Sequence, residues 1–345
     1  MDSDKLNYYT DQSDLADDEK ELYEHFRLIV DKGQSLLRID KFLVDRIGGS
    51  VSRNKIQNAI KADSVLVNDK PVKQNYKIKP CDEIVIVLPK PPLELDLLPE
   101  NIPLDVVYED KSLLVVDKKA GMVVHPGYNN YEHTLLNALL YHFQSNNEND
   151  TFPLLVHRID KDTSGLLVVA KEEFAQTHLA KQFYNHTTNR LYYALVWGDL
   201  QNESGVVSGY IARSQRDRRV MTMYESENEG KWSLTHYKVI ERFGFATLVE
   251  CKLETGRTHQ IRAHMKHIGH PLFADEMYGG KTIVKGNATT KFKQFIDNCF
   301  EIMPRQALHA AVIGFVHPEN GKELYFKSQF PQDFSDLLEK IRKKA

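Results

Sequence analysis

Residues 157–171 read HRIDKDTSGLLVVAK and pass from dense charge to unbroken apolar character within a few positions. The polar part ends at Thr163-Ser-Gly, and the apolar run that begins at Leu166 is typical of a strand buried on both faces. Loops at the edge of a rigid sheet are where catalytic groups tend to lie. Judged by spacing alone, however, a surface loop with local ion pairs is the better interpretation of the charged residues.

Short apolar segments surround this stretch on both sides and predict a sheet. The predicted strands are Leu104–Tyr108, Leu113–Asp117, Leu166–Ala170, Leu191–Val196, Thr235–Ile240, Ala246–Leu253, Ala310–Phe315 and Glu323–Ser328. The predicted helices are Thr134–Phe143, Glu172–Asn185, Arg257–His267 and Pro331–Arg342. Because strands do not alternate one-for-one with helices, and several are joined by short turns, the pattern predicts an α+β domain over residues 102–345 with a mixed, mostly antiparallel sheet.

A smaller, basic module precedes this domain at residues 35–90. Helical periodicity at 37–47 and 52–61 is followed by a predicted hairpin at 64–75 and a β-branched strand at 83–88. From residue 38 onward the module carries eleven Lys/Arg against six Asp/Glu. Basic side chains occupy polar positions of the two helices at Arg38, Lys41, Arg46, Arg53, Lys55 and Lys61. By themselves they are as typical of a solvated face as of a surface that attracts RNA phosphates.

The first 34 residues are predicted to be an acidic, disordered tail. Residues 1–24 carry nine Asp/Glu and two Lys, so the net charge of −3 for the 345-residue chain becomes +4 when they are set aside. Dense like charge with few apolar residues predicts disorder, and a solubilising role is the simplest explanation of the tail. A stiff linker is predicted at residues 91–101, beside the proline-rich run at 89–92.

The composition argues against several classes of protein. Cys81, Cys251 and Cys299 lie far apart without a CxxC pair, so neither a disulfide framework nor a thiolate zinc site is expected. No apolar run reaches the roughly 18 residues that span a bilayer. The first residues also lack the apolar core of a signal peptide. We therefore expect a cytoplasmic protein with no membrane partner.

The stretch at residues 157–171 closely resembles the catalytic motif of the RluA-type pseudouridine synthases, a His-Arg-Leu-Asp core followed by Thr-Ser-Gly-Leu-Leu. Ile159 replaces the commoner Leu, which conserves volume. The resemblance implies that Asp160 is the indispensable catalytic group. It also implies that Arg158 enters the RNA where the target uridine is flipped out.

Further segments agree with this resemblance. Residues 190–196, RLYYALV, look like the family's second motif, which implies that Tyr192 lies under the flipped uracil. An aromatic residue of a strand is more often packed in a core, but Tyr192 and its neighbour point to opposite faces, so only one can line a pocket. Residues 253–264, LETGRTHQIRAH, resemble the third motif, which implies that Arg262 pairs with Asp160.

The remaining resemblances concern the wall of the site and the N-terminal module. Residues 304–310, PRQALHA, resemble the fourth motif and imply that Leu308 forms an apolar wall, and His125 resembles part of a loop that flanks the cleft. LLRIDKFLV, SRNKIQNAIKADSVLVNDKPVK and KIKPCDEIVIV resemble the S4 RNA-binding domain. That resemblance implies RNA contacts from Arg38, Lys41, Arg53 and Lys55.

The implied reaction suits this short set of residues. Conversion of uridine to pseudouridine breaks the N1–C1′ bond, turns the base and remakes the bond at C5, so no cofactor or metal is expected. The carboxylate of Asp160 acts either as a nucleophile at C1′ or as a base that removes the C2′ proton, and the sequence leaves both routes open. We expect the arginine partner to keep Asp160 ionised. A base must leave its stack to be reached, which agrees with a base-flipping arginine.

Two clusters of charged residues allow more than one interpretation. The histidines at 259, 264, 267 and 270 lie close in sequence but lack a His-Glu-x-x-His pattern, so stacking, capping or phosphate contacts are favoured over a metal site. Arg213, Arg216 and Arg218 belong to a loop of dense positive charge. A contact with the RNA backbone is favoured over a plain exposed loop.

Within the family, the S4 module, VVHPG and TLLNALLYH look most like the large-subunit ribosomal RNA synthase D group. The expected partner is therefore large-subunit ribosomal RNA (23S) or an assembling ribosomal particle, bound by a monomer. Other ribosomal or transfer RNA uridines remain an alternative. Two different classes also remain: a non-catalytic ribosome-assembly factor and a metal-dependent RNA hydrolase.

Overall fold

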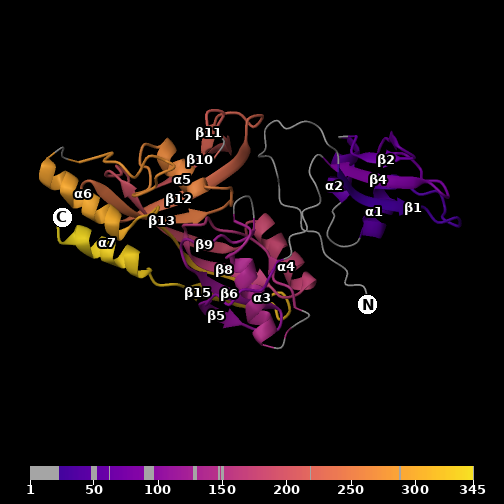
Figure 1. Cartoon of the computed structure of the whole chain (residues 1–345). Coiled ribbons are helices and arrows are strands. Elements are labelled where there is room, and N and C mark those ends of the chain that lie inside the picture. Colours follow the sequence, from indigo (N-terminus) through magenta and orange to yellow (C-terminus); the bar gives the residue numbers. More distant parts are fainter. Residues whose placement is uncertain are drawn as a thin grey trace. The chain divides into compact units, whose positions relative to one another are not determined.

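The computed structural model describes residues 23–47, 53–61, 63–88, 97–126, 130–146, 148, 151–217, 219–286 and 289–344. Its contacts divide the chain into two units, Met1–Asp96 and Leu97–Ala345 (Figure 1). Of the predicted linker, residues 91–96 lie outside the described part. Residues 97–101 belong to the second unit instead, because Glu100 N donates to Asn137 O and Asn137 Nδ2 donates to Leu98 O.

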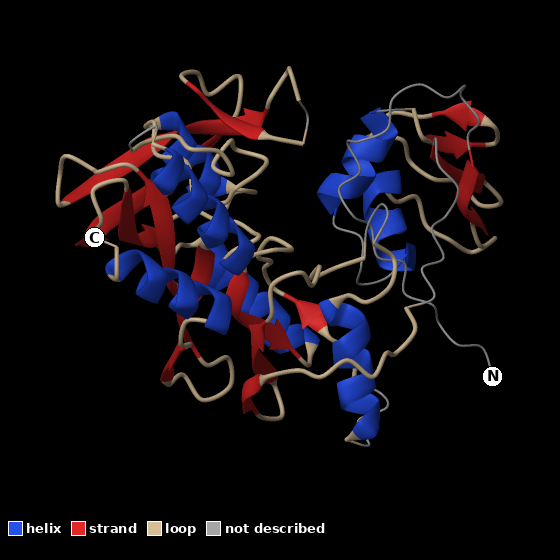
Figure 2. Cartoon of the chain, turned by 60° about the vertical axis from the view of Figure 1, so that its left-hand side comes forward, coloured by secondary structure: helices blue, strands red, loops and turns tan. Residues whose placement is uncertain are grey.

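The first unit packs two helices against a four-stranded antiparallel sheet, shown in blue and red in Figure 2. Its elements are β1 (Tyr23–Ile29), α1 (Ile39–Ile47), α2 (Arg53–Lys61), β2 (Val65–Val67), β3 (Lys70–Pro71) and β4 (Glu83–Leu88), with strand order β1-β4-β2-β3. Ile39 and Leu43 of α1, Ile56 and Ile60 of α2 and Ile84 of β4 share one buried core. Apolar residues three and four positions apart therefore give both helices the face that covers the sheet.

Strand β1 corrects the prediction for the N-terminal tail. Residues 23–29 pair antiparallel with β4, where Leu28 lies opposite Ile84. Val30 follows the strand in the core of the unit, and its N–H donates to Asp82 O. The acidic residues before position 23 obscured the apolar alternation that begins at Phe26. The rest of the predicted tail, residues 1–22, lies outside the described residues.

The second unit is built on a mixed, mostly antiparallel sheet of eleven strands, as predicted. The strands are β5 (Val106–Glu109), β6 (Leu113–Lys118), β7 (Leu154–Leu155), β8 (Ser164–Ala170), β9 (Asn189–Trp197), β10 (Ser204–Arg213), β11 (Met221–Tyr224), β12 (Lys231–Arg242), β13 (Ala246–Leu253), β14 (Leu308–Val316) and β15 (Glu323–Lys327). The main path runs β11-β10-β12-β13-β9-β14-β8-β6-β5, with β15 beside β14 and β7 beside β8. Among these strands only β8 and β14 pair in parallel.

Five helices cover the two faces of this sheet: α3 (Leu135–Ser145), α4 (Glu173–Tyr184), α5 (Gln260–His267), α6 (Thr290–Ile302) and α7 (Gln332–Arg342). Helices α3 and α5 share a core with the even-numbered positions of β9 from Tyr192 onward. Helices α6 and α7 pack together, and their core includes the odd-numbered Leu195 and Trp197. Alternation along β9 thus directs Tyr192 to the face that α5 covers. No helix in the described ranges is long and apolar enough to cross a membrane.

Helix α5 begins three residues later than predicted. His259 has a left-handed backbone conformation, with φ of 51°, and acts as the N-cap residue, so Arg257 lies before the helix. The expectation that Arg257 lies on a turn of the same helix as Arg262 is therefore wrong. Elements β7, β10, β11 and α6 were not predicted at all.

A close backbone contact joins β8 to β14 directly after the polar loop. Gly165 has φ of +116°, and a Cβ atom there would lie 2.2 Å from Ala310 O. No other residue fits this position without moving a strand. The Thr-Ser-Gly segment therefore brings β14, and with it Leu308, to the end of the loop that carries Asp160.

Candidate active site

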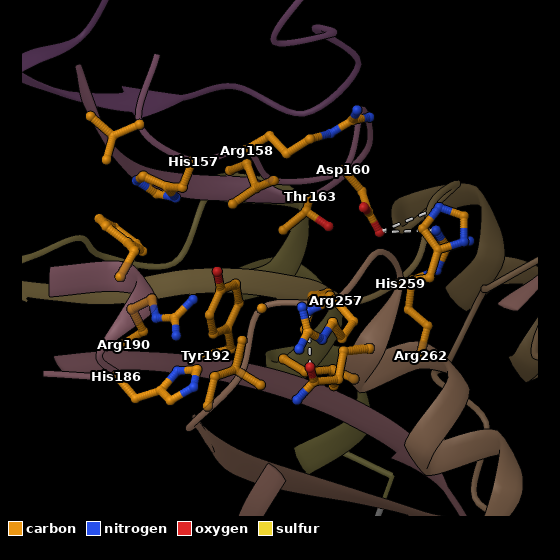
Figure 3. A pocket seen from close by; sticks show the side chains of 18 of the residues that line it. His157, Arg158, Asp160, Thr163, His186, Arg190, Tyr192, Arg257, His259 and Arg262 are labelled. Atoms are coloured by element: carbon orange, nitrogen blue, oxygen red, sulfur yellow. Dashed lines mark hydrogen bonds and ion pairs between the residues drawn. The ribbon is translucent and has the colours of Figure 1, made fainter. Parts of the chain in front are cut away.

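A pocket of about 700 Å³ opens beside the first residues of β8 and β9 (Figure 3). It lies on the face of the sheet that α5 covers. Its walls come from the loop before β8, from the end of α4, from β9, from residues 253–262 and from Leu308. This size admits a small ligand or one extruded nucleotide. The predicted catalytic residues Asp160, Tyr192 and Arg262 all line this pocket.

One arginine holds two carboxylates at the edge of the pocket. Arg262 Nη1 donates to Asp160 Oδ2 at 3.0 Å, and its Nε and Nη2 donate to Asp275 at 2.7 and 2.9 Å. Burial disfavours the charged guanidinium, but the hydrogen bonds and charges of Asp275 and Asp160 outweigh it and raise the pKa of Arg262. Asp275 is fully buried, whereas Asp160 keeps 19% of its side chain exposed toward the pocket. The planar guanidinium is thus oriented by Asp275 so that one N–H remains for Asp160.

Asp275 was not singled out in the sequence. It lies in the loop after α5, inside the stretch ADEMYGG, which has no charge pattern that points to Arg262. Tyr278 of the same stretch lies under the guanidinium, with 4.8 Å from Arg262 Cζ to the ring centre. This loop therefore supports Arg262 with a carboxylate and an aromatic face.

His259 joins the site through the same tyrosine. Met221 N donates to Tyr278 Oη at 2.8 Å, and Tyr278 Oη lies 3.1 Å from His259 Nδ1. His259 Nε2 lies 3.9 Å from Asp160 Oδ2, and burial lowers the pKa of His259. The imidazole of His259 therefore lies between Tyr278 and the carboxylate of Asp160.

Tyr192 and Arg190 occupy the other part of the pocket. Both are nearly buried side chains on the same face of β9, and they lie side by side in Figure 3. Burial raises the pKa of Tyr192; the charge of Arg190 lowers it and that of Asp160 raises it. Tyr193 points to the opposite face, as alternation predicts, and donates to Glu250. Arg190 was not singled out in the sequence.

Two buried cations fix the loop that carries Asp160. Lys118 Nζ donates to the backbone oxygens of Lys119, Met122 and Lys161, each at 2.9 Å. Burial lowers the pKa of Lys118 to about 7. Arg305 Nη1 donates to Asp162 O at 2.9 Å while its Nε and Nη2 hold Asp333. Neither cation was singled out in the sequence.

Only some of the other residues predicted for the site line this pocket. Leu308 and the exposed Arg158 line the pocket, whereas His125 does not and lies 2.8 Å from Pro126 O through Nδ1. Arg213 and Arg216 are exposed at the end of β10 and after it. Arg218 and the side chain of Lys55 lie outside the described part of the chain.

The histidines after residue 258 have separate partners. His264 is fully buried and its Nε2 lies 2.9 Å from Ser233 Oγ, and His270 Nδ1 lies 2.7 Å from Trp197 O. Of the contacts expected for these histidines (stacking, capping or phosphate binding), phosphate binding is excluded for His264, which is part of the core. His267 is exposed on α5.

In the first unit a buried carboxylate organises two of the predicted RNA contacts. Arg38 and Arg53 each donate two hydrogen bonds to Asp40, and Gln57 donates a further one. Asp40 is fully buried, yet both arginine side chains remain close to half exposed. Burial alone would raise the pKa of Asp40, but the hydrogen bonds from these three residues hold it well below its usual range. The two guanidinium groups are thus fixed at the surface. Lys41, beside Asp40, is exposed.

The fold and the site together define a class of enzyme. A carboxylate held by a buried arginine, opposite a strand tyrosine in a pocket of nucleotide size, suits attack at a base–sugar bond. The sequence profile of the RNA pseudouridylate synthase family matches residues 112–267, and that of the S4 domain matches residues 37–84.

Similar proteins agree with both profiles. An uncharacterized RNA pseudouridine synthase of Chlorobaculum parvum is 44% identical over 320 residues, which cover 91% of this chain and 97% of that protein. The ribosomal large subunit pseudouridine synthase D of Zymomonas mobilis is 43% identical, with 88% and 93% covered. The solved structure of human RNA pseudouridylate synthase domain containing 1 is 25% identical, with a TM-score of 0.51 over 70% of this chain and 96% of that one. The chain belongs to the RNA pseudouridine synthase family.

Proposed function

We propose that this protein isomerises uridines of large-subunit ribosomal RNA to pseudouridine, with Asp160 as the catalytic carboxylate. The observation that carries the chemistry is the 3.0 Å contact from Arg262 to Asp160 in a pocket that Tyr192 also lines. The target is supported by relatives named ribosomal large subunit pseudouridine synthase D, among them that of Nitrosomonas europaea, 38% identical over 98% of this chain. Free ribosomal RNA or an assembling particle in the cytoplasm is then the partner, bound by a monomer.

Each of these residues has a specific role in the proposed reaction. Asp160 accepts a hydrogen bond from Arg262 and faces C1′ or the C2′ proton of the extruded nucleotide. Tyr192 stacks on the uracil, and its neutral hydroxyl is placed to relay the C5 proton to water once the new bond has formed, giving up its own hydrogen as it receives that proton. Arg158 is exposed at the rim and fills the space that the flipped base leaves in the RNA. The fixed Arg38 and Arg53 of the first unit hold RNA phosphates away from the reacting base.

The decisive experiment maps pseudouridine in total RNA from cells that lack the protein and from cells that carry Asp160→Asn. Both should lose the same sites in large-subunit ribosomal RNA, and the wild-type gene should restore them. Purified Asp160→Asn should form no product while its affinity for RNA stays within about tenfold, or ~1.4 kcal/mol. Asp162→Asn removes a charge two residues away and serves as the control, with product still formed. Loss of sites only in transfer RNA would contradict the proposed target, and turnover by Asp160→Asn would contradict the proposed role.

A further inference from the structure

Arg190 is a buried cation that the chemistry described above does not use. Its side chain is 6% exposed, and Nε has no hydrogen-bond partner in the structure. Nη2 makes one long contact, 3.4 Å to Glu254 O. No carboxylate of the described residues lies within ion-pair distance of it, in contrast to Arg262. A buried charge without a counter-charge destabilises the folded state. Arg190 is therefore a candidate for a residue that contacts a ligand in the pocket.

The surroundings hold this guanidinium against the pocket. Its carbon lies 5.2 Å above the ring of Phe183, which itself stacks on His157 at 4.5 Å. A Cβ atom at Gly256 would lie 2.7 Å from Arg190 Nη1, so a larger residue there would displace the guanidinium from this position. Burial lowers the pKa of Arg190 from a value so high that the group stays charged at neutral pH. Residues of three separate segments therefore keep a positive charge at the wall of the pocket.

Tyr192 is drawn between Arg190 and Asp160 in Figure 3, and all three side chains line the pocket. Both Arg190 and Asp160 act electrostatically on the Tyr192 hydroxyl, with opposite signs. Arg190 and Tyr192 are two positions apart on one face of β9, and Asp160 reaches the pocket from the loop before β8. A uracil that stacks on Tyr192 with its sugar carbon at Asp160 therefore directs its far edge toward Arg190.

The chemistry of the base gives that far edge a particular importance. When the N1–C1′ bond breaks, its electron pair leaves with uracil as an anion whose charge spreads over N1, O2 and O4. A half-turn about the N3–C6 axis exchanges N1 with C5 and, at the same time, O2 with O4. The C5–C1′ bond then forms with an electron pair of this anion, C5 loses its proton and N1 gains one, so atoms and electrons balance. A carbonyl oxygen thus lies opposite the sugar carbon both before and after the turn.

We propose that Arg190 donates hydrogen bonds to this far carbonyl, O4 in the substrate and O2 in the product, and stabilises the detached uracil anion while it turns. This inference rests on the proposed function of Asp160. A fixed donor aimed at developing negative charge is strongest in a site that excludes water. The same donor disfavours cytidine, which carries an amino group in place of O4, so Arg190 also selects uridine.

The first test separates this role from a structural one. Arg190→Met conserves size and removes the buried charge. It should leave the melting temperature unchanged or raise it, while single-turnover product formation falls by about a hundredfold, the usual effect of deleting such a donor. Arg190→Lys keeps the charge without the planar fork and should recover part of the rate. Arg342→Met removes an exposed arginine that pairs with Glu241 and should change neither quantity.

The second test addresses the uracil anion directly. A short RNA carries 5-fluorouridine at the target, because fluorine withdraws electrons and stabilises the departing anion by itself. The loss caused by Arg190→Met, followed as disappearance of the target nucleoside in digests, should be at least tenfold smaller with 5-fluorouridine than with uridine. Equal losses with both substrates, or a marked fall in melting temperature, would overturn the inference. Full activity of Arg190→Met beside an inactive Asp160→Asn would overturn it alone and leave the proposed function standing.

Discussion

Arg262 divides the hydrogens of one guanidinium between the buried carboxylate of Asp275 and the partly exposed carboxylate of Asp160. Asp275 takes two of its groups and Asp160 takes a third. The pairing of Arg262 with Asp160 could be anticipated, because a specific motif resemblance pointed to both residues. Asp275 could not, because a lone acidic residue in a loop carries no sign of the partner that the fold brings to it. Lys118 and Arg305 could not be predicted either. They donate hydrogen bonds to backbone oxygens, and no sequence pattern indicates such contacts.

Removal of Arg262 should therefore damage both stability and catalysis. Arg262→Ala leaves the fully buried Asp275 without a counter-charge, and breaking such a pair typically costs about 3–5 kcal/mol of unfolding free energy. Arg262→Lys retains the charge but cannot serve both carboxylates with a planar fork, so it should keep folding better than it keeps rate. Urea unfolding and single-turnover rates of the two variants beside wild type test this expectation. An Arg262→Ala protein with wild-type stability and rate would show that the shared pair is unimportant.

The burial of His264 should be visible as acid sensitivity. Burial lowers the pKa of His264 to about 4, whereas the unfolded chain has an ordinary value of about 6.5. The unfolded state therefore binds more protons between these values, and stability is lost as pH falls from about 6.5 to 4, by about 3 kcal/mol for this group.

The test compares substitutions of two histidines on helix α5, the buried His264 and the exposed His267. His264→Asn should flatten the dependence of unfolding free energy on pH between 4 and 6.5, whatever it does to stability at pH 7. His267→Asn replaces an exposed histidine three residues further along α5 and should keep most of the dependence, because burial lowers the pKa of His264 more than the charge of His267 does. Identical pH dependence in all three proteins would contradict the assignment of His264 as a neutral core residue.

At the scale of elements, the long apolar strands were predictable and the irregular ones were not. Strands β6, β8 and β13 consist largely of buried residues, and apolar side chains predominate in their sequences. Strand β10 contains two glycines and alternates with polar residues, so its signal is weak. Helix α5 begins late because His259 adopts a left-handed conformation, which no propensity at that position predicts.

Strand β1 should contribute to the stability of the first unit. It covers one edge of β4, whose residues 84–86 are buried. A chain that begins at residue 23 should melt like the full chain, whereas a chain that begins at residue 31 exposes an apolar strand edge and should melt lower and aggregate. Thermal unfolding and light scattering of the two shortened chains measure this difference. Equal behaviour of both would show that the pairing of β1 with β4 adds nothing.

At the scale of the whole molecule, we expect the first unit to contribute mainly to RNA affinity and the second unit to carry out the reaction. The first unit carries the paired arginines that Asp40 fixes, and the second carries the complete pocket. A chain of residues 97–345 should bind structured ribosomal RNA more weakly and with a shallower dependence of log K on log salt, because fewer phosphates are contacted. Its rate on a saturating short RNA should change much less. Equal affinity and salt slope of the shortened and full chains, at the same salt, would remove the first unit from RNA binding.

The route of the chain through the second unit has a consequence for protein synthesis. The pocket is lined from Val156 through to Leu308, and Arg305 braces the loop of Asp160 from 143 residues further along. Strand β8 gains its partner β14 only when residues 308–316 are present. A nascent chain on the ribosome therefore carries Asp160 for almost half of its translation before any groove exists around it. We therefore expect a chain that ends before position 300 to be inactive although it contains Asp160, Tyr192 and Arg262, because it lacks Arg305, Leu308 and β14.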